Sequence, residues 1–146
     1  MTDNELTHAI IGAAMEVHRI LGPGLLESTY RNRLLHELQL RGFTVLTERP
    51  IPVVYKQTKL ECGFRLDLRI EDRTIVELKS IQIIAPVHQA TLLTYLRLSG
   101  RRLGLLINFN ADVLKNGVRR YIMDTPKAFN TERTELSAQR SQRHHA

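Results

Sequence analysis

The chain contains little cysteine and few aromatic residues, and it has no long apolar run. Its single cysteine, Cys62, excludes an intrachain disulfide and a zinc cluster built from cysteines. No apolar run reaches the roughly 18 residues of a membrane-spanning helix, and Asp3, Glu5 and Glu16 interrupt the pattern of a secretory signal. With 5% aromatics, the chain offers no platform for stacking single-stranded nucleic acid. From these absences we expect a cytoplasmic protein that does not enter a membrane.

The composition that is present suits one globular domain, with 146 residues of which 42% are apolar and 25% charged. Lys and Arg number 21 against 15 Asp and Glu, and the net charge of +6 favours an anionic partner such as nucleic acid. Apolar periodicity disappears after about residue 124. We therefore expect a single domain over residues 1–124 and a flexible polar tail over residues 125–146.

Helical spacing, strand alternation and turn residues predict a clear order of elements. A capping box at residues 2–5 opens the first helix, and Gly22, Pro23 and Gly24 must end it. Further helices are expected over residues 26–40 and 87–99, and strands over residues 44–48, 51–55, 59–70, 73–80, 103–108 and 118–123. A block of strands with one helix inserted before a later strand predicts an α/β (mixed α+β) domain.

Two consecutive strands, residues 63–70 and 73–80, alternate apolar and charged side chains. If residues 71–73 form a three-residue hairpin turn, all the apolar residues meet on one face. A two-residue turn would mix the faces, so the hydrophobic pattern selects the longer turn. The opposed pairs on the apolar face are then Ile70–Thr74, Leu68–Val76 and Leu66–Leu78.

The same register brings together charged side chains on the other face, where Asp67 lies opposite Glu77 and Arg65 opposite Lys79. Opposed Cβ atoms are roughly 4.5–5.5 Å apart, so two carboxylates repel there unless a cation lies beside them. Mg²⁺ suits this position because it usually takes one or two carboxylates, water and substrate phosphate. Lys79 would orient an attacking water or stabilise a phosphoryl oxygen. The alternative is a solvated face with a weak Lys79–Glu77 ion pair.

Several segments carry a resemblance to a known family. "GLLESTY" at residues 24–30 fits Gly-x-x-Glu-x-x-Tyr, and the agreement continues in "CGFRLDL", "IVELKS", "PVHQATLLTYLRLSG" and "RLGLLINFN". Over roughly residues 4–123 the chain resembles the GxxExxY proteins, small bacterial proteins of the PD-(D/E)xK nuclease-like superfamily. The resemblance implies a restriction-endonuclease-like core with a central mixed sheet flanked by helices. It also implies that Asp67 is the metal-binding aspartate and Glu77-Leu78-Lys79 the Glu-x-Lys motif.

The resemblance assigns further residues to the site. It implies that Glu27 joins Asp67 and Glu77 in holding Mg²⁺ (or Mn²⁺), although an acid in the first turn of a helix is also favoured by the helix dipole alone. The expected substrate contacts are Gln89, Tyr95 and Arg65. Tyr30 and His18 are expected to be structural.

One position departs from the pattern of similar nucleases, which often place a glutamine one helical turn before a tyrosine. The residue four before Tyr95 is Thr91, and Gln89 lies on a different helical face. Three hypotheses stay open: a Mg²⁺-dependent nuclease acting on DNA or RNA, a nuclease fold that binds nucleic acid without cutting it, and a protein-interaction module or homodimer. The departure at Thr91 favours the second, and the acidic pair favours the first.

Overall fold

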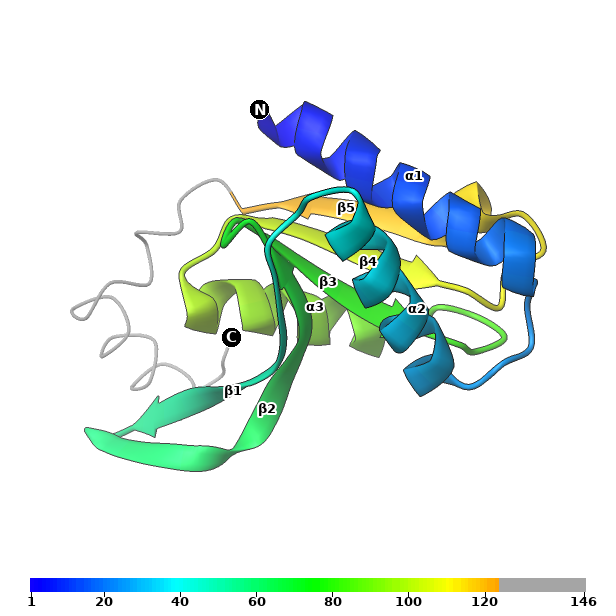
Figure 1. Cartoon of the computed structure of the whole chain (residues 1–146). Helices are drawn as coiled ribbons and strands as arrows, with labels where there is room; N and C mark the ends of the chain where they lie inside the picture. The colour runs from blue at the N-terminus through cyan, green and yellow to red at the C-terminus, as the bar shows by residue number, and fades with distance from the viewer. Residues whose placement is uncertain (124–146) are drawn as a thin grey trace.

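The computed structural model describes residues 1–123, apart from the side chains of residues 48–53 and 59–66 (Figure 1). The expected tail and the side chains of Cys62 and Arg65 lie outside the described residues. The elements follow in the order α1 (Asp3–Leu21), α2 (Glu27–Leu40), β1 (Val45–Tyr55), β2 (Thr58–Ile70), β3 (Thr74–Lys79), α3 (Pro86–Ser99), β4 (Leu103–Asn108), the 3-10 helix η1 (Leu114–Gly117) and β5 (Val118–Ile122).

The five strands form one mixed sheet in the order β1-β2-β3-β4-β5. Strands β3 and β4 are parallel and are joined through α3, whereas the other neighbours pair antiparallel. A parallel pair needs such a crossover, because no short turn returns the chain to the same end of the sheet. The mixed sheet with its three flanking helices confirms the expected fold class.

Helices cover both faces of the sheet, with α1 and α2 on one face and α3 on the other (Figure 1). Alternate residues of β3 divide between the two cores: Val76 and Leu78 pack with α1 and α2, and Ile75 packs with Leu92 and Leu96 of α3. Because helices cover both faces of the sheet, most side chains of β3 and β4 are apolar on both faces. No helix in the described part of the chain has the length and hydropathy needed to cross a membrane.

The helix ends follow from their local sequence. Thr2 Oγ1 accepts a hydrogen bond from Glu5 N at 3.1 Å, and Glu5 Oε1 accepts one from Thr2 N at 2.7 Å, which confirms the capping box. Helix α3 begins with Pro86 in its first turn and ends at Gly100, whose φ of 71° lies in the left-handed region that favours glycine.

Strand β1 differs from its prediction. We expected two short strands separated at Pro50, but one strand runs from Val45 to Tyr55, with a register shift between Ile51 and Val53. The expected break is therefore wrong. The physical reason is that β1 lies at the edge of the sheet, where a proline without an N–H donor can be accommodated.

Candidate active site

Asp67 is the residue of β2 directly before Leu68, where the pairing of β2 with β3 begins. The two strands pair at Ile70–Thr74 and Leu68–Val76, as the three-residue turn predicts. One residue further along, Asp67 Oδ2 accepts a hydrogen bond from the backbone N–H of Leu78 at 2.9 Å. A side-chain oxygen of Asp67 thus accepts the hydrogen bond that a backbone carbonyl would accept in a regular strand pair. This bond holds the carboxylate at the opening between β2 and β3, next to the last paired residues.

Glu77 is the most deeply buried acid of this site. Its side chain is 7% exposed, and Oε1 is buried without a hydrogen-bond partner among the residues that the structure describes. Burial, the negative charge of Asp67 and a hydrogen bond with Asp67 together raise the pKa of Glu77 to about 9, and Lys79 only partly opposes them. Lys79 Nζ lies 3.8 Å from Glu77 Oε2. Near neutral pH this carboxyl group therefore keeps its proton unless a cation replaces it.

Glu27 reaches the same neighbourhood from the first turn of α2. Ser80 Oγ donates a hydrogen bond to Leu25 O at 2.6 Å, which ties the start of α2 to the chain just after β3. Burial raises the pKa of Glu27, while the charge of Lys79 lowers it and that of Asp67 raises it. Glu27 therefore shares the electrostatic environment of the other three charged residues.

The donor set fits a divalent cation that keeps part of its water shell. Asp67 and Glu77 bring two carboxylates together, and the unpartnered Glu77 Oε1 is a buried oxygen that a cation would satisfy. Across the described ranges of the chain, no three His, Cys, Asp or Glu side chains group closely enough to hold a metal ion by themselves. The structure thus does not bring Glu27 into a closed ligand set with Asp67 and Glu77. Two carboxylates are, however, the number that Mg²⁺ commonly takes.

The other two residues of the Gly-x-x-Glu-x-x-Tyr segment shape the loop that precedes Glu27. Gly24 has a φ of 96°, which disfavours any residue with a Cβ. Tyr30 is fully buried; its hydroxyl donates to Gly22 O at 2.5 Å and accepts from Leu25 N at 3.1 Å. Its ring stacks on Phe109 with centroids 4.6 Å apart. The prediction that Tyr30 is structural is confirmed.

His18 also has a structural contact, because its Nε2 lies 2.8 Å from Ala111 O, in the loop that follows β4. This hydrogen bond connects α1 to that loop. The contact supports the prediction of a structural histidine.

The candidate substrate contacts on α3 lie apart from one another. Tyr95 is 8% exposed and packs in the core between α3 and the sheet, whereas Gln89 is exposed. Thr91 Oγ1 donates to Val87 O of its own helix at 2.9 Å. His88, whose Nδ1 accepts from Ala85 N at 2.8 Å, lies near enough to Glu27 to lower its pKa. As substrate contacts, Gln89 and Tyr95 stay predictions, and Arg65 lies outside the described side chains.

Arg31 is a member of the site that the sequence interpretation missed. Its Nε donates to Asp67 Oδ1 at 3.3 Å, and the two side chains are 19% and 15% exposed. Arg31 follows Glu27 by four residues on α2, so the two project from the same helical face. That spacing was the available signal. Because Arg31 shares a helical face with Glu27, the sequence already indicated that both side chains lie near the same site.

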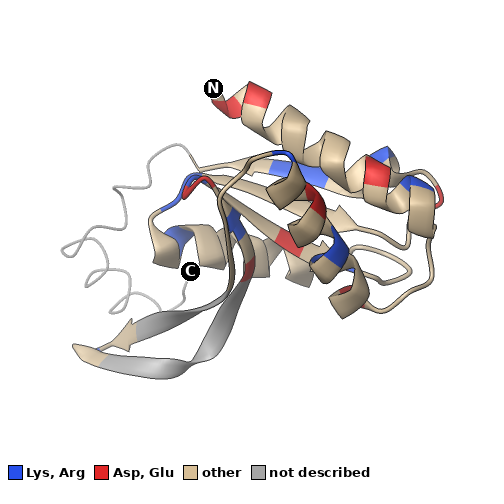
Figure 2. Ribbon diagram, viewed as in Figure 1, with Lys and Arg blue, Asp and Glu red and all other residues tan. Residues whose placement is uncertain are grey.

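Basic residues are spread over several elements; Figure 2 shows them interspersed with acids on α1 and α2, and without acids on β5. Several of them form ion pairs within the fold: Arg73 with Asp3, and Arg101 with Asp72 at 2.7 Å. The positive net charge thus partly serves to hold the chain together. It does not by itself mark a nucleic-acid surface.

A family model described as the PD-(D/E)XK nuclease superfamily matches residues 4–121. Neither the curated proteins nor the solved structures contain a significant match to the chain. Members of this superfamily are nucleases that act on nucleic acid and generally use divalent metal ions. The matched range runs from the first turn of α1 to Tyr121 in β5 and includes Asp67 and the Glu77-Leu78-Lys79 segment. The chain therefore belongs to the PD-(D/E)XK nuclease superfamily.

Proposed function

We propose that this protein is a metal-dependent nuclease of the GxxExxY type that hydrolyses phosphodiester bonds of DNA or RNA. The observation that carries the proposal is the meeting of Asp67, Glu77 and Lys79 at the opening between β2 and β3. Asp67 and Glu77 would hold Mg²⁺ or Mn²⁺ directly, and Glu27 would contact the ion through a bound water. The superfamily supports the nuclease activity, and the residue roles are our assignment.

The chain's own residues would divide the work of hydrolysis. When bound, the divalent ion lowers the pKa of an attacking water and offsets charge on the phosphoryl oxygens. Lys79, 3.8 Å from Glu77 Oε2, would orient that water and stabilise the negative charge that builds at phosphorus. The water oxygen would bond to phosphorus as the ester P–O bond breaks; the water would release one proton to solvent, and the leaving oxygen would take one up from solvent, so that the step balances.

The decisive experiment is a cleavage assay on mixed DNA and RNA substrates with Mg²⁺ or Mn²⁺. We expect cleavage that EDTA abolishes and that Lys79→Ala lowers by about 100-fold or more, the usual cost of losing a transition-state donor. Lys115→Ala is the matched control, because it removes the same charge from an exposed side chain outside the β2–β3 hairpin. Equal cleavage by Lys79→Ala and Lys115→Ala would remove Lys79 from the mechanism.

A second candidate is a nuclease fold that binds nucleic acid without cutting it. It is supported by the Arg31–Asp67 ion pair, which occupies one of the oxygens that a metal would need, and by Thr91, whose hydroxyl is bonded within its own helix. Under this proposal wild type shows no cleavage, and salt-sensitive binding survives in Lys79→Ala. Assembly as a homodimer or on a protein partner is a further proposal, which light scattering and the absence of nucleic-acid affinity would support.

A further inference from the structure

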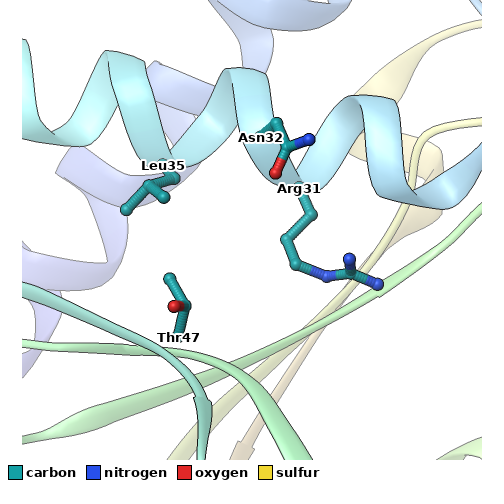
Figure 3. Close-up of a pocket in the computed structure, with 4 residues that line it drawn as sticks. All are labelled: Arg31, Asn32, Leu35 and Thr47. Carbon is teal, nitrogen blue, oxygen red and sulfur yellow. The ribbon is translucent and has the colours of Figure 1, made fainter.

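A cleft lies beside the candidate active site, between α2 and β1. It has a volume of about 270 Å³ and is lined by Arg31, Asn32, Leu35 and Thr47 (Figure 3). Figure 3 shows Arg31 extending from the helix toward the strands, and Thr47 on the strand side of the cleft across from Leu35. Arg31 is the residue that connects this cleft with the acidic pair, because its Nε is bonded to Asp67 Oδ1.

The lining of the cleft is suited to an anion. It provides one guanidinium, one amide and one hydroxyl, and no carboxylate is among the described residues that line it. Arg, Asn and Thr side chains are typical contacts of the phosphate and sugar groups of nucleic acids. A guanidinium carries five N–H donors in a rigid fork, and the bond to Asp67 uses the one on Nε.

The size of the cleft argues against a complete small-molecule ligand. Small-molecule sites usually measure about 300–1,000 Å³ and enclose most of the ligand. A cleft of about 270 Å³ with mainly polar lining instead fits one unit of a longer chain. The neighbouring acidic pair, where the scissile phosphate would lie, is one side chain away through Arg31.

We propose that this cleft binds the nucleic-acid backbone next to the scissile phosphate, and that Arg31 contacts a phosphate there while it holds Asp67. The inference deepens the proposed function and rests on its substrate class. It assigns to α2 and β1 the role of guiding the strand toward the opening between β2 and β3. Asn32 and Thr47 are substrate contacts in this arrangement.

Binding to a short fluorescent DNA duplex, and to single strands of DNA and RNA, measured by anisotropy in EDTA, tests the cleft without cleavage. Arg31→Ala should weaken binding about 10-fold and reduce the salt dependence by about one phosphate contact. Asn32 is exposed, so both charges can be introduced there without disturbing the core. We expect Asn32→Asp to weaken binding and Asn32→Lys to strengthen it, each by about threefold or more.

Asn116 supplies the matched controls, because it is exposed on η1, outside the cleft lining. Asn116→Asp and Asn116→Lys make the same changes of net charge and should alter affinity by less than about twofold. If Asn32 and Asn116 variants respond alike, only net charge matters and the cleft proposal is overturned. Thermal unfolding of each variant identifies any that fail to fold.

Arg31→Ala also removes a bond to Asp67, so a purely positioning role must be separated from substrate contact. Thr47→Val keeps the shape of the side chain, removes its hydroxyl and leaves the Arg31–Asp67 pair in place. Weakened binding in Thr47→Val and Asn32→Asp supports the cleft, whereas normal binding in both overturns it. Cleavage by wild type with unaffected cleft variants would sink this inference and leave the nuclease in place. Binding that depends on the cleft, without cleavage, would support this inference and contradict the proposed nuclease activity.

Discussion

The carboxylate of Asp67 accepts a hydrogen bond from the backbone N–H of Leu78 on the neighbouring strand at 2.9 Å. Asp67 therefore has two functions that substitution can separate. Its Oδ2 extends the contact between β2 and β3 beyond the pair Leu68–Val76, and its negative charge acts on Glu77 in the candidate metal site. The first needs an acceptor oxygen, whereas the second needs a carboxylate.

Asp67→Asn and Asp67→Ala distinguish these functions. Asparagine keeps an acceptor for Leu78 N, so in EDTA we expect the unfolding free energy of Asp67→Asn, measured by urea unfolding, to exceed that of Asp67→Ala by about 1–2 kcal/mol. We expect Mg²⁺ to stabilise wild type but neither variant, because a ligand stabilises a protein only by binding its folded state. Equal unfolding free energies of the two variants in EDTA would contradict the role assigned to the Leu78 hydrogen bond.

The raised pKa of Glu77 predicts how stability depends on pH. Burial and the Asp67 charge raise that pKa to about 9 in the folded protein, against 4.5 for an ordinary glutamate. Between these values the folded chain keeps a proton that the unfolded chain releases, so Glu77 contributes stability that is fully present below about pH 4.5 and is lost as pH rises toward 9.

Glu77→Gln removes this titration. In EDTA, the unfolding free energy of wild type relative to Glu77→Gln should fall between pH 5 and 8, by at most about 1.4 kcal/mol per pH unit. Urea unfolding of the two proteins over this range makes the measurement, and groups that titrate alike in both cancel in the difference. A difference that does not vary with pH would mean that Glu77 is ionised in the folded, metal-free protein.

Tyr30 predicts a stability effect that is tied to the site. Tyr30→Phe keeps the ring on Phe109 but removes the hydroxyl that bonds Gly22 O and Leu25 N. We expect a loss of about 1–3 kcal/mol of unfolding free energy, because two backbone groups lose their partner. Tyr55→Phe is the control: Tyr55 is 46% exposed, and its substitution should have little effect. Equal losses in both variants would contradict the structural role of the Tyr30 hydroxyl.

The sequence predicts the hairpin of β2 and β3 well because the information is local. Alternating apolar residues on both sides of a three-residue turn allow one register with a consistent apolar face, and the pairs Ile70–Thr74 and Leu68–Val76 confirm it next to the turn. The strand pairing ends there, so the expected pairs Leu66–Leu78 and Asp67–Glu77 are not part of it. The same register predicted that Asp67 and Glu77 lie close together, and Asp67 is close enough to raise the pKa of Glu77. The roles of both residues stay predictions.

The parts that the sequence did not predict depend on packing between distant segments. Arg31 and Asp67 are 36 residues apart, and their ion pair requires α2 to lie at one particular angle over β2. The cleft adds Thr47, whose approach to Arg31 depends on how α2 sits against β1. Likewise, the continuity of β1 through Pro50 follows from its edge position, which alternation within the strand cannot reveal.

Substitution of glycine by alanine should destabilise the protein at Gly117 and stabilise it at Gly12. A Cβ on Gly117 would lie 2.5 Å from the carbonyl oxygen of Asn108, whose side-chain Oδ1 accepts from Ile81 N two residues beyond Lys79. Gly117→Ala should therefore cost about 1–3 kcal/mol of unfolding free energy and reduce cleavage by displacing that segment. Gly12 lies inside α1, where a Cβ would meet its nearest atom at 3.6 Å, so Gly12→Ala should stabilise by about 0.5–1 kcal/mol. Thermal and urea unfolding of both variants make the comparison. Tolerance of alanine at Gly117 would mean that η1 can move away from Asn108 without loss.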